Sequence, residues 1–509
     1  MDTLLLGIDI GTSSCKCCLL SSRGELLGTA SREYSPHYPQ PGWVEQEPQE
    51  WYLTTLACLK DLADQPGIDL HQVGAIGVTG QMRGPTFLDR DGNPVRPSIL
   101  WNDLRCEREV AELNAKYTDL LRRVTHNPLN TMCTLPKLLW IFRNEPDTWR
   151  KTATLLYPKD YINYCLTGER HTDLSDASGS SCYDIHRETW SEEILERFSI
   201  AREVLPEILP SSAVTGRLCR AAAQATGMTE GILVVAGASD ATIEMLSTGI
   251  ESERQCKIRL GSSGAISTVV DHLDAQGEGQ YYCWSYIFPG QWMLDLNTRA
   301  CAHATLWLRQ VCYAGISDSS AAYRRIEVEA RRVPPGSEGL FFHPYLLGED
   351  APYWEPHLKA SFFGLTSAHL RPHLARAVLE GTGYALRDAI RIYAEQAARF
   401  EDYIFVGGGT RNSLWVAIVA DILGIDGRIN RQTDAAYGAA MLAGLGCGAF
   451  SSLGQADEVC RSREKVIVRH DPALHQHYSR LFERYIEIKR VYDSLYLLTS
   501  EAGESPDVT

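Results

Sequence analysis

Two aspartates in this 509-residue chain stand where a carboxylate could act on a substrate. Asp240 lies in the stretch VAGASDATIE, after small residues and the apolar run 232–235, and Asp9 ends the apolar run near the N-terminus. Asp240 could cap the helix that follows by accepting hydrogen bonds from its free N–H groups. It could instead be a general base at the tip of a parallel strand. These residues alone leave both interpretations open.

Three loops rich in Gly, Ser and Thr follow or join apolar runs, and such loops expose backbone N–H groups that can hold phosphate. They are Gly11-Thr12-Ser13-Ser14, Gly261-Ser262-Ser263-Gly264 and Gly407-Gly408-Gly409-Thr410. None matches the Walker A or GxGxxG pattern, and each alone is typical of a plain turn. Three in one chain favour a polyphosphate ligand, with Asp9 near its Mg²⁺.

The elements that would position these residues alternate between strands and helices, which predicts α/β architecture. Residues 4–10 and 15–20 read as a hairpin, and residues 258–260 and 265–270 repeat its shape. The repeat indicates duplicated halves facing each other across a cleft. The other expected elements are strands at 75–79, 232–236 and 403–406, and helices at 136–142, 376–395, 413–423 and 434–445.

Composition excludes several classes of function. The chain is too long for one hydrophobic core, so we expect two or more domains. The net charge of -15 argues against a nucleic-acid or anionic-membrane partner. Fifteen cysteines without a CxxC motif indicate buried free thiols in a reducing cytoplasm. We find no signal-peptide pattern and no apolar run of roughly 18 residues, so we expect a cytoplasmic protein.

Longer motifs resemble the FGGY carbohydrate kinase family, relatives of glycerol kinase. The start GIDIGTS is similar to the family's first phosphate loop, and MCTLPKLLWIFRN and ASFFGLTSAHLRPHLARAVLE are similar to its two signatures. The stretches GQM, ILWND, PKDY and SDA are similar to the xylulokinase branch of the family. The similarity runs from residue 4 to about residue 490.

The resemblance implies two actin-like, ribonuclease-H-like domains with ATP and sugar meeting in the cleft between them. The N-terminal domain would cover residues 1–246 and the C-terminal domain residues 247–490, with residues 491–509 as a helix end and disordered tail. Asp240 would be the catalytic base, taking the proton from the sugar hydroxyl that attacks the γ-phosphate of ATP. Asp9 and Asp240 would lie at the Mg²⁺.

The other implied site residues form two groups. Those on the ATP side are Gly11, Thr12, Ser13, Lys16, Gly261, Ser262, Gly408, Gly409 and Asn412. Those on the sugar side are Gln81, Met82, Arg83, Asn102, Asp103 and Asp240. Asn412 could instead cap the following helix, and Trp101-Asn102-Asp103 taken alone is typical of a turn. A homodimer is an open alternative, since dimers are common among relatives.

The resemblance implies a kinase that uses ATP and Mg²⁺ to phosphorylate a ketopentose, with D-xylulose and its 5-phosphate as first candidates. Another pentulose, a polyol or a sugar acid such as gluconate remain alternatives, as does a non-catalytic actin-like ATP-binding protein. Three residues depart from the family pattern: Arg83 replaces His and Ala241 replaces Asn, which both bear on the substrate, and Asp350 replaces Arg, which removes a cation. Arg83 could bind a carboxylate, or it could turn towards solvent or a neighbouring acid.

Overall fold

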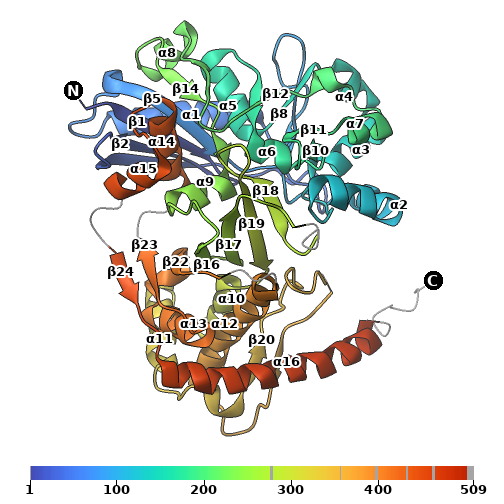
Figure 1. Ribbon diagram of the computed structural model, residues 1–509, viewed down its shortest axis with the longest axis vertical. Helices are drawn as coiled ribbons and strands as arrows, with labels where there is room; N and C mark the ends of the chain where they lie inside the picture. Colours follow the sequence, from blue (N-terminus) through green and yellow to red (C-terminus); the bar gives the residue numbers. More distant parts are fainter. Residues whose placement is uncertain are drawn as a thin grey trace. The chain divides into compact units, whose positions relative to one another are not determined.

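The computed structural model describes residues 2–274, 279–355, 357–395, 399–430, 434–460 and 465–500. The chain forms two compact units, each assembled from separate segments (Figure 1). The first comprises Met1–Ser252, Val269–Leu294 and Gln432–Arg463, and the second Glu253–Thr268, Asp295–Arg431 and Glu464–Thr509. The expected cut after residue 246 falls within α9 (Asp240–Ser247). Domains 1–246 and 247–490 stay a prediction, and residues 501–509 of the expected tail lie outside the described residues.

The first unit is built on a sheet of strand order β13-β14-β5-β1-β2-β3, with β15 paired to β5. Its strands are β1 (Leu4–Ile10), β2 (Ser14–Ser21), β3 (Leu26–Glu33), β5 (Val73–Gly80), β13 (Val214–Arg217), β14 (Leu233–Val235) and β15 (Ala238–Ser239). β1 is antiparallel to β2 and parallel to β5, and β15 is parallel to β5. The carboxyl ends of β1, β5 and β15 therefore meet at one edge, where open α/β sheets bind ligands.

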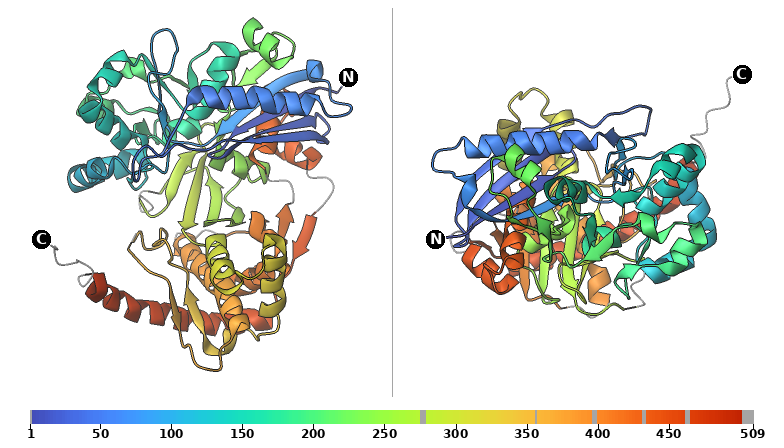
Figure 2. Two further views of the ribbon diagram at one scale, coloured as in Figure 1. Left: turned by 180° about the vertical axis from the view of Figure 1, so that it is seen from behind. Right: turned by 90° about the horizontal axis from the view of Figure 1, so that it is seen from above.

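Successive side chains of β1 point to opposite faces of this sheet, and different helices pack on the two faces. Leu6 and Ile8 lie in the core that includes residues of α1 (Pro48–Ala63) and α5 (Pro158–Thr167). Gly7, which points the other way, contacts α14 (Ala435–Gly446). Figure 2 shows α1, in blue, lying along the sheet. Asp9 shares the α14 face with Gly7, so the folding pattern directs this carboxylate towards the start of α14.

The close approach of α14 depends on glycine at position 7. A Cβ there would lie 1.8 Å from the carbonyl oxygen of Ala436 and 2.6 Å from the backbone nitrogen of Ala440. We expect Gly7→Ala to lower the free energy of unfolding by about 1–3 kcal/mol, because the helix must move off the sheet. Urea unfolding measures this. Gly315→Ala is the control, since a Cβ on Gly315 meets no heavy atom within 4 Å; equal stability of the two variants would contradict this packing.

The second sheet has the order β18-β19-β17-β16-β22-β23-β24. Its strands are β16 (Gln255–Leu260), β17 (Gly264–Val270), β18 (Tyr282–Ser285), β19 (Trp292–Thr298), β22 (Asp402–Val406), β23 (Gly427–Asn430) and β24 (Lys465–Val468). β16 is antiparallel to β17 and parallel to β22, as β1 is to β2 and β5. The repeated arrangement confirms the predicted duplication and the actin-like, ribonuclease-H-like α/β fold.

The remaining elements surround these sheets. In the first unit the further helices are α2 (Glu107–Thr125), α3 (Thr134–Asn144), α4 (Pro146–Lys151), α6 (Leu174–Ser178), α7 (Glu192–Phe198), α8 (Arg220–Thr226) and α15 (Leu453–Cys460). The second unit adds α10 (Ala302–Cys312), α11 (Ser319–Ala330), α12 (Arg371–Glu395), α13 (Ser413–Leu423) and α16 (Pro472–Ser500). Among the described residues, five two-stranded sheets pair β4 (Glu45–Gln46) with β7 (Ser98–Ile99), β6 (Thr86–Leu88) with β8 (Thr154–Leu156), β9 (His171–Asp173) with β12 (Glu207–Leu209), β10 (Tyr183–Asp184) with β11 (Thr189–Trp190), and β20 (Phe341–His343) with β21 (Ser361–Phe363).

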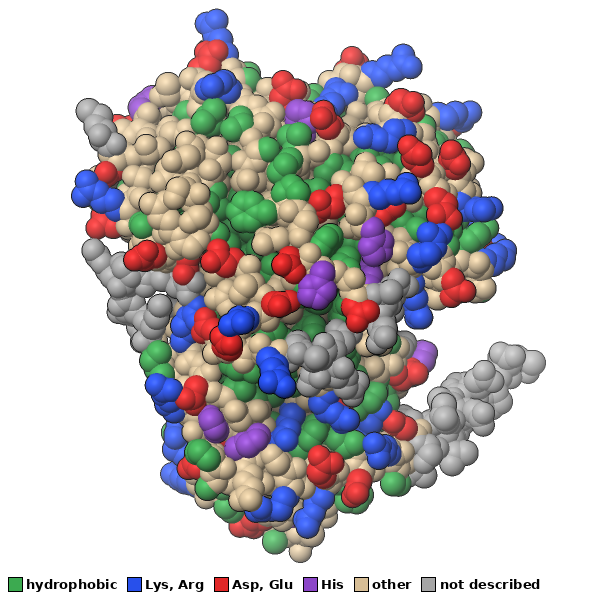
Figure 3. Space-filling model, viewed as in Figure 1, with side chains coloured by type: hydrophobic (Ala, Val, Ile, Leu, Met, Phe, Trp, Pro, Cys, Tyr) green, Lys and Arg blue, Asp and Glu red, His purple; other side chains and the backbone are tan. Residues whose placement is uncertain are grey.

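On the face drawn in Figure 3, acidic and basic side chains are interspersed over the described surface. The absence of a nucleic-acid partner stays a prediction from the net charge. Within the described part of the chain, no helix combines the length and the apolar character needed to cross a membrane.

Candidate active site

Three carboxylates and one ammonium group come together at the carboxyl edge of the first sheet. Lys16 on β2 pairs with Asp9 in the strand register, and its Nζ lies 3.2 Å from Oδ2 of Asp434. Asp434 caps α14 by accepting a hydrogen bond from the backbone of Ala436 at 2.9 Å. Burial, with the charges of Asp240 and Asp434, raises the pKa of Asp9 to about 8 against the opposing charge of Lys16. Asp9 therefore interacts electrostatically with Asp240, Asp434 and Lys16.

The carboxyl group of Asp9 fits a divalent metal ion. Its Oδ1 is buried and accepts no hydrogen bond from the described residues, and such an atom calls for a ligand. Carboxylate oxygens are the donors that Mg²⁺ takes. A cation here would offset the repulsion that Asp240 and Asp434 exert on Asp9. The sequence predicts only a helix start at Asp434, because the packing of α14 on β1 is what brings Asp434 towards Asp9.

Asp240 is the first residue of α9, and Ser239 occupies the N-cap position. Asp240 is therefore not the N-cap residue, and the cap interpretation is wrong. Its Oδ1 still accepts a hydrogen bond from the backbone N–H of Ala241 at 2.8 Å. Ser239 pairs with Gly80 on β5, so Asp240 follows a parallel strand at the ligand-binding edge. The side chain is half-buried. A carboxylate so placed can reach a bound hydroxyl, as a general base must.

Gln81 follows β5 directly and is tied to the first predicted phosphate loop. Its Nε2 donates to Oε1 of Gln46 at 2.8 Å, and Nε2 of Gln46 donates to the carbonyl oxygen of Thr12 at 2.8 Å. Oε1 of Gln81 is buried and accepts no hydrogen bond from the described residues, so it is available to a ligand hydroxyl. Sequence reasoning missed Gln46, because a single Gln before a helix carries no signal.

Arg83 points into the protein, so the solvent-facing interpretation is wrong. The residue is 5% exposed and has a left-handed backbone, φ 66°. Its Cζ lies 5.5 Å from the ring centroids of both Tyr282 and Trp284 on β18. Nε is buried and donates to no described acceptor. Met82 lies beside Arg83, since a Cβ on Gly179 would contact both of their side chains. The two aromatic residues lie far along the chain, so no local pattern could indicate them.

Asn102 and Asp103 differ in what they can offer a sugar. Oδ1 of Asn102 is buried and accepts no hydrogen bond from the described residues. Asp103 is fully buried, and its oxygens accept hydrogen bonds from the backbone of Val44 at 2.6 Å and from the guanidinium of Arg105 at 2.7 and 2.8 Å. Asp103 therefore holds its own loop in place. Its contact with sugar stays a prediction, and Asn102 has the spare acceptor.

The first predicted phosphate loop closes as a tight turn. Gly11 donates its N–H to the carbonyl oxygen of Ser14 at 3.0 Å, so this group is not directed at a phosphate. The hydroxyl of Thr12 receives a hydrogen bond from the indole of Trp101 at 3.0 Å, and the carbonyl oxygen of Ser13 accepts one from Tyr34 at 3.1 Å. Phosphate contacts by this loop stay a prediction.

The second unit brings the two other glycine loops together. β16 and β22 are parallel neighbours, so Gly261 and Gly407 leave the sheet at the same edge. A Cβ on Gly407 would lie 3.1 Å from the backbone nitrogen of Gly261. Ser262, Gly408 and Gly409 follow in these loops. Asn412 caps α13, because its Oδ1 accepts a hydrogen bond from the backbone of Trp415 at 3.0 Å. The cap interpretation of Asn412 is confirmed, and its contact with adenosine stays a prediction.

Asp350, one of the departures from the family pattern, forms an ion pair within the second unit. Its Oδ1 lies 2.7 Å from Nε of Arg299. The backbone N–H of Arg299 also donates to Oε1 of the neighbouring Glu349 at 2.8 Å. Burial raises the pKa of Glu349 to about 8, partly opposed by the hydrogen bonds it accepts. The substitution therefore places a carboxylate where it holds Arg299.

These features are typical of one class of protein, the actin-like kinases: the first unit has a candidate base and a candidate metal-binding carboxylate, and the second unit has glycine loops. Residues 4–247 match the N-terminal domain of the FGGY family of carbohydrate kinases, and residues 270–447 match its C-terminal domain. The xylulose kinase of Lactococcus lactis is 33% identical over 98% of this chain and 97% of that protein. The chain belongs to the FGGY family of carbohydrate kinases, which makes it an ATP-dependent sugar kinase.

Solved structures agree with this fold. The xylulose kinase of Rhodospirillum rubrum matches with a TM-score of 0.89 and 30% identity, over 97% of this chain and 99% of that chain. The gluconate kinase of Lactobacillus acidophilus matches with a TM-score of 0.89 and 25% identity, over 97% of this chain and 99% of that chain. Since the named substrates differ, the fold alone does not choose between them.

Proposed function

We propose that this protein transfers the γ-phosphate of ATP to a ketopentose, with D-xylulose giving D-xylulose 5-phosphate. The observation that carries the proposal is the half-buried carboxylate of Asp240, placed beside Asp9 at the carboxyl edge of the first sheet. The spare acceptors on Gln81 and Asn102 suit the hydroxyl groups of a sugar. The relative from Lactococcus lactis, named a xylulose kinase, supports this substrate.

In the proposed reaction, Asp240 accepts the proton of the attacking hydroxyl as that oxygen bonds to the γ-phosphorus. The bond from phosphorus to the β–γ bridging oxygen breaks, and ADP leaves. Asp9 and Asp240 would hold Mg²⁺, which offsets phosphate charge when bound. Gln81 and Asn102 would orient the sugar, and Arg83 would add a charged donor. Positioning of this kind supplies much of the rate in phosphoryl transfer.

A panel of sugars tests the substrate. We expect D-xylulose to have the highest kcat/KM in an ADP-release assay against D-ribulose, arabinitol, glycerol and gluconate. Arg83→His should lower kcat/KM for D-xylulose by about 10-fold, because a hydrogen bond from a charged donor is lost. Arg108→His is the control, since the side chain of Arg108 is 82% exposed. If the wild type preferred gluconate and Arg83→His lost that preference, the substrate would be a sugar acid and not D-xylulose.

The use of Mg²⁺ is part of this proposal. A homodimer and a cytoplasmic location stay predictions from the sequence. The non-catalytic actin-like alternative is not favoured, because the chain belongs to a family of kinases.

A further inference from the structure

The segment that carries Asp240 is held by side chains from other parts of the first unit. The amide of Asn163 donates to the carbonyl oxygen of Ala236 at 2.8 Å, and the hydroxyl of Thr79 donates to that of Ala238 at 2.7 Å. The backbone N–H of Ser239 donates to Oγ of Ser175 at 2.8 Å. The last of these fixes the residue directly before the base. All of these donors and acceptors are buried, so water does not compete with the bonds.

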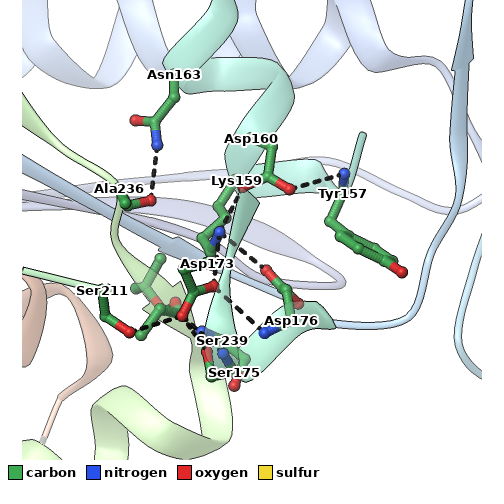
Figure 4. Close-up of polar contacts among 12 residues, drawn as sticks. Tyr157, Lys159, Asp160, Asn163, Asp173, Ser175, Asp176, Ser211, Ala236 and Ser239 are labelled. Carbon is green, nitrogen blue, oxygen red and sulfur yellow. Dashed lines mark hydrogen bonds and ion pairs between the residues drawn. The ribbon is translucent and has the colours of Figure 1, made fainter. Parts of the chain in front are cut away.

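Ser175 is itself fixed by a buried carboxylate (Figure 4). Its hydroxyl donates to Oδ2 of Asp173 at 2.7 Å while accepting the N–H of Ser239. The same Oδ2 accepts a hydrogen bond from the hydroxyl of Ser211 at 2.7 Å. The hydroxyl hydrogen of Ser175 is therefore committed to Asp173, which leaves its oxygen lone pairs facing Ser239. The Ser175 hydroxyl therefore has one orientation, because rotating it would break the hydrogen bond to Asp173.

Lys159 lies at the centre of the cluster. Its Nζ lies 2.9 Å from Asp173 and 3.2 Å from Asp176, and it also pairs with Asp160. Burial, the largest single effect, lowers the pKa of Lys159, but the three carboxylates outweigh it and hold that pKa well above the usual range. The stem of Lys159 passes close to the Asp240 segment, since a Cβ on Gly237 would lie 3.4 Å from its Cδ.

Stability is a poor explanation for such a cluster. Replacing a buried ion pair by apolar residues of similar volume is often neutral or stabilising. One ammonium group here faces three buried carboxylates, and burial raises the pKa of Asp176 well above its usual range. The cluster is costly to bury and ends in a hydrogen bond beside the base. Positioning of the base explains it better than stability does.

We propose that Lys159, Asp173 and Ser175 form a positioning relay that orients Ser239 and, through it, the carboxylate of Asp240. The inference rests on the proposed role of Asp240 as the base. The relay residues act on the base through the backbone and need no contact with substrate. Loss of the Ser175 hydroxyl leaves the N–H of Ser239 without its buried acceptor and frees the segment to shift. A shift of about 1 Å in reacting groups can lower the rate about 100-fold.

Ser175→Ala tests the relay. We expect kcat for the sugar to fall by about 10- to 100-fold, with KM for ATP within about twofold of the wild type, because the nucleotide loops do not depend on Ser175. Ser180→Ala is the matched control: Ser180 is equally buried, and its Oγ also accepts a backbone N–H, from Cys182 at 2.9 Å. Thermal unfolding of both variants separates loss of stability from loss of turnover. Equal kcat in the two variants would overturn the relay.

Hydrogen exchange gives a readout that needs no substrate. The amide hydrogen of Ser239 should exchange faster in Ser175→Ala than in the wild type. In Ser180→Ala its exchange rate should equal that of the wild type. Unaltered exchange in Ser175→Ala would overturn the relay even if turnover fell. Wild-type protein without activity on D-xylulose, but with this contrast in exchange, would refute the proposed substrate while supporting the relay as a structural link to Asp240.

Discussion

Asp240→Asn should lower kcat for the sugar by about 100- to 10,000-fold, the range that a general base contributes. Asn keeps the size of the side chain but cannot take a proton at neutral pH. ATP affinity should stay close to that of the wild type, because the nucleotide is predicted to contact the glycine loops. Steady-state ADP release, with ATP binding measured by calorimetry, checks both parts.

Asp147→Asn is the matched control for this loss. Asp147, like Asp240, lies in the first turn of a helix, but its side chain is 77% exposed. Its kcat should equal that of the wild type. Near-wild-type turnover by Asp240→Asn would show that the base lies elsewhere and would refute the proposed mechanism.

Asp9→Asn should lower kcat/KM by about 100- to 1,000-fold, since a bound metal supplies several kcal/mol of charge stabilisation. The variant loses the charged oxygen donor that lies buried and unpaired among the described residues. It should also need a higher Mg²⁺ concentration for half-maximal rate. A Mg²⁺ titration of the initial rate at saturating sugar measures the shift.

Asp434→Asn is the comparison that makes this result specific. Asp434 is more exposed than Asp9, and its carboxylate already pairs with Lys16 and caps α14. We therefore expect a smaller loss of activity and a Mg²⁺ dependence closer to that of the wild type. If Asp9→Asn kept the wild-type Mg²⁺ dependence, Asp9 would have no part in binding the metal.

The parts of the site that follow a strand could be predicted from the sequence. Asp9 lies near the end of an apolar run and Asp240 comes after one, and the carboxyl ends of parallel strands meet at one edge. The repeat of hairpin and small-residue loop likewise indicated the duplicated sheets. In each case the signal lies in a few consecutive residues, so local patterns were enough.

Other parts depend on packing between distant segments. Asp434 reaches Asp9 because α14 packs on β1, and Tyr282 and Trp284 reach Arg83 from β18. No local pattern encodes such a meeting. Asp103 shows another limit: the family resemblance implied a carboxylate facing the sugar, whereas Arg105 and Val44 already bind its oxygens, and its contact with sugar stays a prediction. Sequence patterns identify residue types, but folding decides which polar atoms are left for a ligand.

A crystal structure with D-xylulose, ADP and Mg²⁺ would test the role of Asp240 as the base. We expect the hydroxyl to be phosphorylated to lie about 2.6–3.2 Å from a carboxylate oxygen of Asp240, with other hydroxyls near Gln81 and Asn102. D-Xylulose bound with no hydroxyl within reach of Asp240, or bound away from the carboxyl edge of the first sheet, would contradict it.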